Sequence, residues 1–153
     1  MLSGAAQFGK ADQGIFAFWL HSWREQRPLK YIGFNGQGYQ VRHCLHPRYF
    51  TDLLALQLHA GCAPGKPRLI NVSGGVGPTM SLQQLSQWCT ERWGAAAVSH
   101  QPEPRAYDLP WLVLDHQKAT DLWGWSPKIS TADVLGEIAA FADTNPNWIK
   151  LSA

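Results

Sequence analysis

The segment LKYIGFNGQGYQVRHCLHP, residues 29–47, holds the sequence features that most constrain the fold. Its first apolar stretch, 29–34, predicts a strand. The following Asn35-Gly36 favours a hairpin turn, because both residues tolerate positive φ. Residues 40–45 are then predicted to form the returning strand, and Pro47 suits the first turn of a helix. The segment therefore predicts two paired strands followed by a helix.

Helices are predicted on both sides of this segment from apolar spacing and capping residues. Pro28 ends the first helical pattern, and Gly94 ends a later one that opens with the capping box Ser81–Gln84. Asp115 and Ser130 stand where the last two helices would begin. The predicted helices cover residues 11–27, 47–59, 81–93, 115–123 and a final stretch after Ser130.

Short strands are predicted between these helices. A buried strand over 68–72 is followed by the glycine-rich 73–77, an edge strand is predicted over 95–99, and a further apolar run covers 111–114. No repeat, low-complexity tract or linker divides residues 1–153. The expected architecture is therefore one mixed α/β domain.

The composition is that of a globular protein and excludes several classes of function. Hydrophobic residues make up 45% of the 153 residues, which suits one domain. The formal charge of +2 provides no basic field for nucleic acid, and no apolar run approaches the roughly 20 residues of a membrane-spanning helix. The pattern of a secretory signal is missing from residues 1–10. Three scattered cysteines indicate free thiols in a reducing, cytoplasmic compartment.

Eight tryptophans are many for a chain of this length. They indicate either a large aromatic core or a core that expects another surface to cover it. For Trp88, Trp93, Trp123 and Trp125, a position in the core is favoured over a role in a ligand cage.

Arg42 lies on the second predicted strand, at the end of the motif Gly36-Gln37-Gly38-Tyr39-Gln40-Val41-Arg42. A guanidinium offers a planar fork of donors that matches phosphate oxygens two at a time, and a strand gives it a fixed base. The alternative is a surface arginine on an edge strand. One arginine taken alone favours that alternative.

Arg105-Ala106-Tyr107-Asp108 precedes Pro110 in a loop that leads into the apolar run at 111–114. An arginine and an aspartate at this spacing suit a diphosphate and a ribose hydroxyl together. They suit equally a local salt bridge on the surface, worth under about 1 kcal/mol. The pair taken alone favours the salt bridge.

Other patterns that carry chemistry are weak or missing. His43 and His46 form His-x-x-His without further ligands at suitable spacing, so no metal site is expected. Ser73–Gly77 matches no phosphate-loop pattern, and a structural turn is favoured there. No Ser-His-Asp or Cys-His set is recognisable by spacing. The sequence also contains no Tyr-x-x-x-Lys and no N-terminal Gly-x-x-Gly-x-x-Gly.

Taken together, several short blocks resemble a known family in their identity and order. They look like the C-terminal part of an extended short-chain dehydrogenase/reductase that acts on nucleotide sugars. The first two look closest to the CDP-paratose 2-epimerase (CDP-tyvelose epimerase) branch. The resemblance covers nearly the whole chain and rests on the ordered set, because each block is weak alone. The blocks are Gln7-Phe8-Gly9, Asp12-Gln13-Gly14, Gly36-x-Gly38-x-Gln40-Val41-Arg42, Asn71-Val72-Ser73-Gly74-Gly75, Ser81-Leu82-x-x-Leu85, Arg105-x-x-Asp108 and Gly124-Trp125-x-Pro127.

The resemblance implies an NAD-dependent enzyme whose N-terminal half is a Rossmann domain with the cofactor and the catalytic tyrosine and lysine. The C-terminal half of such an enzyme binds the nucleotide sugar. By this resemblance two arginines hold the diphosphate, an aspartate orients one of them or meets the ribose, and two N-terminal residues lie near the sugar. Because the chain starts just before the first block, neither a cofactor site nor a catalytic residue is expected in it. The implied substrate-binding residues are Gln7, Phe8, Gln40, Arg42, Arg105 and Asp108.

The sequence departs from the family pattern at three places. His43 stands where the family usually has Asp after the arginine, which would remove a partner that holds Arg42 in place. Arg48 and Tyr49 occupy the start of the next helix, where the family usually has an acidic residue, and Gly4-Ala5-Ala6 replaces a Gly-Pro-Gly-like turn. The lost aspartate fits relaxed constraint on a truncated reading frame.

Three hypotheses on function follow from the resemblance. The first is a fragment of a nucleotide-sugar epimerase that binds its nucleotide sugar weakly and lacks redox chemistry by itself. The second is a complementing subunit that docks on a separately encoded Rossmann half, with the surplus aromatic residues at the interface. The third is a non-catalytic interaction module or decayed remnant, prone to self-association.

Overall fold

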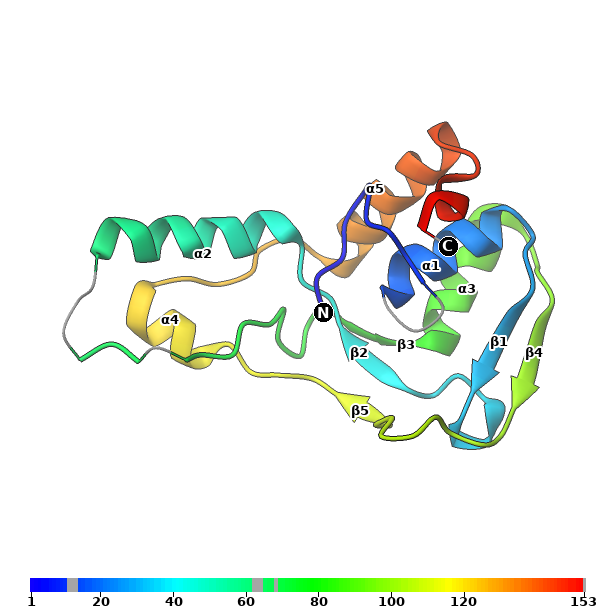
Figure 1. Cartoon of the computed structure of the whole chain (residues 1–153), viewed down its shortest axis with the longest axis horizontal. Helices are drawn as coiled ribbons and strands as arrows, with labels where there is room; N and C mark the ends of the chain where they lie inside the picture. The colour runs from blue at the N-terminus through cyan, green and yellow to red at the C-terminus, as the bar shows by residue number, and fades with distance from the viewer. Residues whose placement is uncertain (11–13, 62–64, 68, 153) are drawn as a thin grey trace.

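The computed structural model of the protein describes residues 1–10, 14–61, 65–67 and 69–152. Its helices are α1 (Ile15–Arg24), α2 (Pro47–Ala60), α3 (Leu82–Trp93), α4 (Gln117–Trp123) and α5 (Thr131–Thr144). Its strands are β1 (Leu29–Ile32), β2 (Val41–His43), β3 (Thr79–Ser81), β4 (Val98–Gln101) and β5 (Trp111–Leu112). Figure 1 shows α2 and α4 at one end of the molecule and α1, α3 and α5 toward the other.

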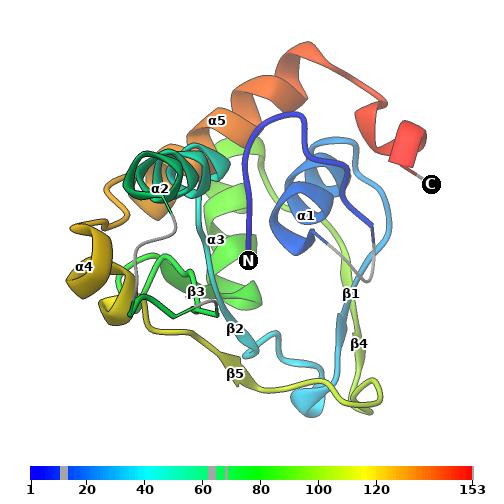
Figure 2. The same cartoon turned by 60° about the vertical axis from the view of Figure 1, so that its left-hand side comes forward.

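The strands form two small sheets, which confirms the mixed α/β class. β1 pairs in parallel with β4, so that Leu29 lies opposite Val98. β2 is the middle strand of the second sheet, antiparallel to β3 and parallel to β5. Two segments far apart in the sequence, β2 and the loop that leads into β5, are therefore neighbours in space (Figure 2).

The main hydrophobic core lies between α1, α3, α5 and β1. Trp19 of α1 stacks on Tyr31 of β1 with ring centroids 5.6 Å apart. The Trp19 indole N–H and the Tyr31 hydroxyl both donate to Ser86 Oγ, at 3.0 and 2.6 Å. These bonds satisfy polar groups that would otherwise be costly to bury among apolar side chains. The aromatic residues of α1 therefore build a core in which their polar atoms are paired.

A second, smaller core lies beneath α2 and α4. It consists of the buried side chains Leu45, Leu53, Ala119 and Trp125. The Trp125 indole N–H donates to the carbonyl of Tyr49 at 2.8 Å and so ties the segment after α4 to the first turn of α2. Of the four tryptophans assigned to the core from sequence, Trp125 is buried, and Trp88, Trp93 and Trp123 pack at the edges of the two cores.

The predicted helices are confirmed, most closely where a capping residue begins them. Ser81 and Gln84 form the expected capping box of α3, Ser130 caps α5, and Pro47 occupies the first turn of α2. The first helix spans Ile15–Arg24, shorter than the predicted 11–27, of which 11–13 lie outside the described residues. The N-cap of α4 is His116, one residue later than predicted, although the Asp115 carboxylate still accepts from the backbone N–H of Gln117.

The predicted hairpin at Asn35-Gly36 is wrong. Both residues have positive φ as expected, at 64° and 67°, but they lie in a short 3-10 turn, Phe34–Gly36. β1 and β2 do not pair, because the chain continues past Gly38, which packs on the Tyr31 ring, and enters the other sheet. A tight turn therefore forms as the sequence predicts, while tertiary contacts decide where the next strand goes.

Two other predicted strands differ from the structure. Residues 69–72 form no strand, and Leu69 is 85% exposed, so the prediction of a buried strand over 68–72 is wrong; Arg68 itself lies outside the described residues. The edge strand predicted over 95–99 lies at Val98–Gln101, against β1. The apolar run at 111–114 contributes only the two residues of β5, both with exposed side chains.

Candidate ligand-binding site

Arg42 is held at both ends of its guanidinium. One Nη donates to the Val41 carbonyl at 2.8 Å, and the other donates to the Asp108 carboxylate at 2.7 Å. The Arg42 side chain is only 16% exposed, and β2 is the middle strand of its sheet. The alternative of a surface arginine on an edge strand is therefore wrong.

Hydrogen bonds within the turn at 105–109 hold Asp108 in position. Its backbone N–H donates to the Arg105 carbonyl at 3.2 Å, and its carboxylate also accepts from the backbone N–H of Leu109 at 3.0 Å. The ion pair that it forms is with Arg42, across the parallel pairing of β2 and β5. Asp108 thus supplies the brace for Arg42 that His43 cannot supply.

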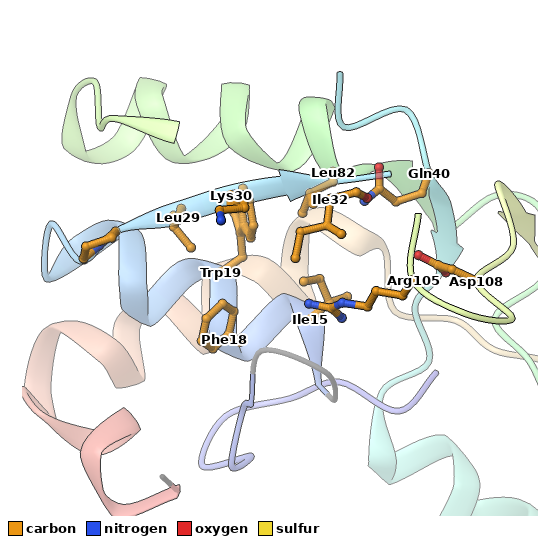
Figure 3. Close-up of a pocket in the computed structure, with 11 residues that line it drawn as sticks. Ile15, Phe18, Trp19, Leu29, Lys30, Ile32, Gln40, Leu82, Arg105 and Asp108 are labelled. Atoms are coloured by element: carbon orange, nitrogen blue, oxygen red, sulfur yellow. The ribbon is translucent and has the colours of Figure 1, made fainter. Parts of the chain in front are cut away.

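Two adjoining cavities lie beside this pair and share Ile15, Gln40, Arg105 and Asp108 among their lining residues. The first has a volume of about 220 Å³, and α1, β1 and the start of α3 supply its apolar wall. The second has a volume of about 310 Å³ and is more polar, because Arg42 reaches it. Figure 3 shows Arg105 extending across the cavity toward Ile15, with the apolar side chains beyond it. The apolar wall consists of Ile15, Phe18, Trp19, Pro28, Leu29, Ile32 and Leu82.

Gln40 lies where the two cavities meet. Its amide N–H donates to the Ile32 carbonyl at 3.3 Å, which ties the start of β2 to the end of β1. The amide oxygen is buried and finds no partner among the residues that the structure describes. A buried acceptor without a partner is costly, and a ligand donor in the cavity would satisfy it.

Gln7 and Phe8 do not line either cavity. The Gln7 side chain donates to the Leu2 carbonyl at 3.0 Å, and the Phe8 ring stacks on Trp148 with centroids 4.9 Å apart. Gln7 lies beside Gly14, one residue before the Ile15 that lines the cavities. The structure thus brings together Gln40, Arg42, Arg105 and Asp108, and the position of Gln7 and Phe8 near a sugar stays a prediction.

The two histidines of His-x-x-His point to different partners. His43 Nδ1 lies 3.3 Å from the Leu112 carbonyl, and burial lowers the pKa of His43 below its ordinary value. His46 Nε2 instead pairs with the Glu137 carboxylate at 2.9 Å, and its Nδ1 accepts from the first turn of α2. Throughout the described ranges, no three His, Cys, Asp or Glu side chains gather as metal ligands.

The glycine-rich Ser73–Gly77 serves a structural purpose. A Cβ at Gly74 would lie 1.9 Å from the carbonyl oxygen of Cys44, so only glycine permits this approach to β2. The Ser73 hydroxyl accepts from the backbone N–H of Gly75. The loop is packed against the protein, as the interpretation of a structural turn predicts.

Sequence analysis missed the residues that supply the apolar wall of the site. Ile15 and Trp19 were recognisable as the apolar face of a helix, but periodicity does not distinguish a core wall from a cavity wall. Lys30 also lines the apolar cavity, and no sequence signal marks it. Tyr107 lines the polar cavity inside a motif that was assessed only for its charged ends.

No protein-family model matches the chain, and no curated protein matches it in sequence. Solved structures do match. UDP-glucuronic acid 4-epimerase from Bacillus cereus, in complex with UDP-glucuronic acid and NAD, is 18% identical with a TM-score of 0.75; the match covers 94% of this chain and 43% of that one. UDP-glucose 4-epimerase from Thermotoga maritima, with UDP-glucose, is 20% identical with a TM-score of 0.74 over the same shares, 94% and 43%.

The fold is that of the C-terminal part of a nucleotide-sugar epimerase. A third match, the enzyme WbmG from Bordetella bronchiseptica in complex with NAD, is 22% identical with a TM-score of 0.69, over 95% of this chain and 42% of that one. The chain thus spans less than half the length of these proteins. At this level of identity the likeness establishes the fold alone.

The described residues do not form a fitting site for NAD. Binding of a dinucleotide in this class of fold uses an open parallel sheet with a glycine-rich turn that presents free backbone N–H groups. Here the sheets have two and three strands in the described part of the chain, and the glycine-rich loop packs onto the Cys44 carbonyl. Within the same residues, no helix is both long enough and apolar enough to cross a bilayer.

Proposed function

We propose that this chain is the nucleotide-sugar-binding part of an NAD-dependent epimerase of the extended short-chain dehydrogenase/reductase type. The observation that carries the proposal is the joint lining of one cavity by Arg42 and Arg105, with an apolar cavity beside it. Two guanidinium groups match a diphosphate, which carries charge and offers several acceptor oxygens. The apolar cavity supplies a wall for a base.

The parts of the ligand are assigned by the chemistry of each wall. The diphosphate lies between Arg42 and Arg105, and Asp108 keeps the first guanidinium in place. The base lies against Leu29 and Ile32, where the buried amide oxygen of Gln40 accepts from an exocyclic amine or a ring N–H. Each charge-assisted hydrogen bond contributes about 1.5–3 kcal/mol where water is largely excluded.

For the nucleotide we propose cytidine diphosphate. Gln7-Phe8-Gly9 and Asp12-Gln13-Gly14 support this choice through their resemblance to CDP-paratose 2-epimerase. Two of the structural relatives named above were solved with UDP-sugars, so uridine diphosphate is the competing ligand. Cytosine and uracil each offer a group that can donate to Gln40, so the affinities for CDP and UDP have to be compared by titration.

Calorimetric titration of the purified chain with CDP, UDP and dTDP tests the proposal. We expect saturable binding with a dissociation constant of about 1 mM, because a half-open cavity leaves the arginines partly hydrated. Equal affinity for CDP and UDP would remove the assignment to cytidine and leave the site intact. Failure of all three nucleotides to bind would reject the proposed function.

The chain alone is expected to show no NAD reduction and no epimerase turnover, because it contains no Tyr-x-x-x-Lys.

A second candidate function is that of a subunit that complements a separate cofactor-binding half. The exposed apolar face of α2 favours it: Leu54 is 41% exposed and Leu58 is 81% exposed, and Leu69 nearby in sequence is 85% exposed. Such side chains are typical of a surface that a partner covers. Co-expression with a neighbouring reading frame that encodes a Rossmann half, followed by co-purification, tests this candidate. Absence of a stable complex favours the non-catalytic module.

A further inference from the structure

Tyr107 combines two properties that the fold does not require. Its φ is 62°, in the left-handed region that a bulky non-glycine residue rarely adopts. The residue is 100% exposed, so its ring is not packed against the rest of the protein. Glycine or asparagine would adopt the same backbone conformation more readily. Strained backbone positions cluster at active sites and ligand-binding sites.

The position of Tyr107 is equally specific. It lies between Arg105 and Asp108 in the turn, and it lines the polar cavity but not the apolar one. The hydrogen bond from the Asp108 N–H to the Arg105 carbonyl closes the turn and sets Tyr107 at its tip. Tyr107 therefore lies at the edge of the cavity that Arg42 and Arg105 line, with its ring open to solvent.

We propose that Tyr107 is a ligand-binding residue whose ring packs over the ribose-diphosphate portion of a nucleotide in the arginine-lined cavity. This inference rests on the proposed function and deepens it. An exposed ring is suited to this contact because it buries a large area at little cost in side-chain freedom. Covering the diphosphate also excludes water, which strengthens the charge-assisted hydrogen bonds from the two arginines.

The strained turn explains why a tyrosine is useful at this position. With φ at 62° the turn places the residue at its tip rather than along the strand that follows. In this turn Arg105, Tyr107 and Asp108 all line the same cavity.

Titration of three variants with UDP and CDP tests the proposal. Tyr107→Asn keeps a residue that tolerates positive φ and removes the ring, and we expect about fivefold weaker binding. Tyr107→Phe keeps the ring and loses the hydroxyl, and we expect binding within about twofold of wild type. Tyr39→Asn is the matched control, since Tyr39 is a tyrosine that is 57% exposed and lines neither cavity.

The outcomes separate this inference from the proposed function. If wild type binds neither UDP nor CDP, both proposals fall. If wild type binds and Tyr107→Asn binds equally well, only the role of Tyr107 is overturned. Equal losses in Tyr107→Phe and Tyr107→Asn, or a loss in Tyr39→Asn as large as that in Tyr107→Asn, would also overturn it. The thermal midpoint of Tyr107→Asn should be no lower than that of wild type, and a clear drop would show that the ring serves folding instead.

Discussion

The Asp108 carboxylate lies 2.7 Å from an Nη of Arg42, although 66 positions separate the two residues in the sequence. The parallel pairing of β2 with β5 brings them together. Both side chains are mostly buried, at 16% and 23% exposure, so the pair is screened less than a surface salt bridge. The two sequence motifs that suggested a diphosphate are thus parts of one arrangement.

Breaking this pair should weaken nucleotide binding. Asp108→Asn removes the charge that fixes Arg42, and we expect about 3–10-fold weaker binding and a loss of about 1 kcal/mol in the free energy of unfolding.

Arg42→Lys and Arg105→Lys keep the charge but lose the planar fork, and each should weaken binding too. Titration with CDP and denaturant unfolding provide the measurements. If both lysine variants bind CDP as wild type does, the assigned diphosphate site is wrong.

Gly74 and Gly77 should respond very differently to alanine. A Cβ at Gly74 would lie 1.9 Å from the Cys44 carbonyl oxygen, whereas nothing lies within 4 Å of one at Gly77. We expect Gly74→Ala to lower the free energy of unfolding by about 1–3 kcal/mol or more, because the backbone must move. Gly77→Ala should stay within about 0.5 kcal/mol of wild type. Equal behaviour of the two variants in urea unfolding would contradict the packing of this loop.

The exposed face of α2 should drive self-association of the isolated chain. Leu58→Glu combined with Leu54→Glu places charge on that face, and we expect fewer oligomers in sedimentation and less dye binding at an unchanged thermal midpoint. Leu53→Ala is the matched control, because Leu53 is the buried leucine of the same helix, at 1% exposure. It should cost about 2–5 kcal/mol in unfolding and leave self-association in place. A wild-type chain that is a sharp monomer without dye binding would count against this surface.

Stability should fall as the pH is lowered below neutral. Burial lowers the pKa of His21 below its ordinary value of 6.5, with Glu25 opposing and Arg24 assisting. The unfolded chain therefore binds more protons below pH 6.5, and the contribution of His21 is lost as the pH falls through its lowered folded pKa. Urea unfolding from about pH 7.5 to about pH 5 measures the slope. His21→Gln should show a shallower slope, with the remainder due to His43 and the Met1 amino group, because burial lowers the pKa of both.

Local signals allowed much of the helical structure to be predicted. Ser81, Ser130 and Pro47 affect only the few residues next to them, and α3, α5 and α2 begin where these residues indicate. Strand pairing depends on contacts between distant segments, and short strands carry little information about their partners. The Asn35-Gly36 turn illustrates the difference, since its backbone conformation was predictable and the partner of β2 was not.

The candidate site was predictable in its residue types and not in its geometry. The spacing of Arg105 and Asp108 suggested a salt bridge between these two residues, whereas in the structure Asp108 forms its salt bridge with Arg42. No pattern along the chain predicts this partner, because the contact depends on the parallel register of β2 and β5. The positive φ of Tyr107 is likewise a property of the closed turn and not of the tyrosine.

The separation of the two hydrophobic cores implies an order in which the molecule opens. Among the described residues, the small core under α2 and α4 holds four buried side chains, whereas the main core between α1, α3 and α5 holds fourteen. Backbone amides of α2 should therefore exchange with deuterium through local opening, at lower free energy than those of α1 and α3. Since Arg42 and Arg105 border the main core through Ile15, a molecule with α2 and α4 loosened would keep the cavity that the two arginines line.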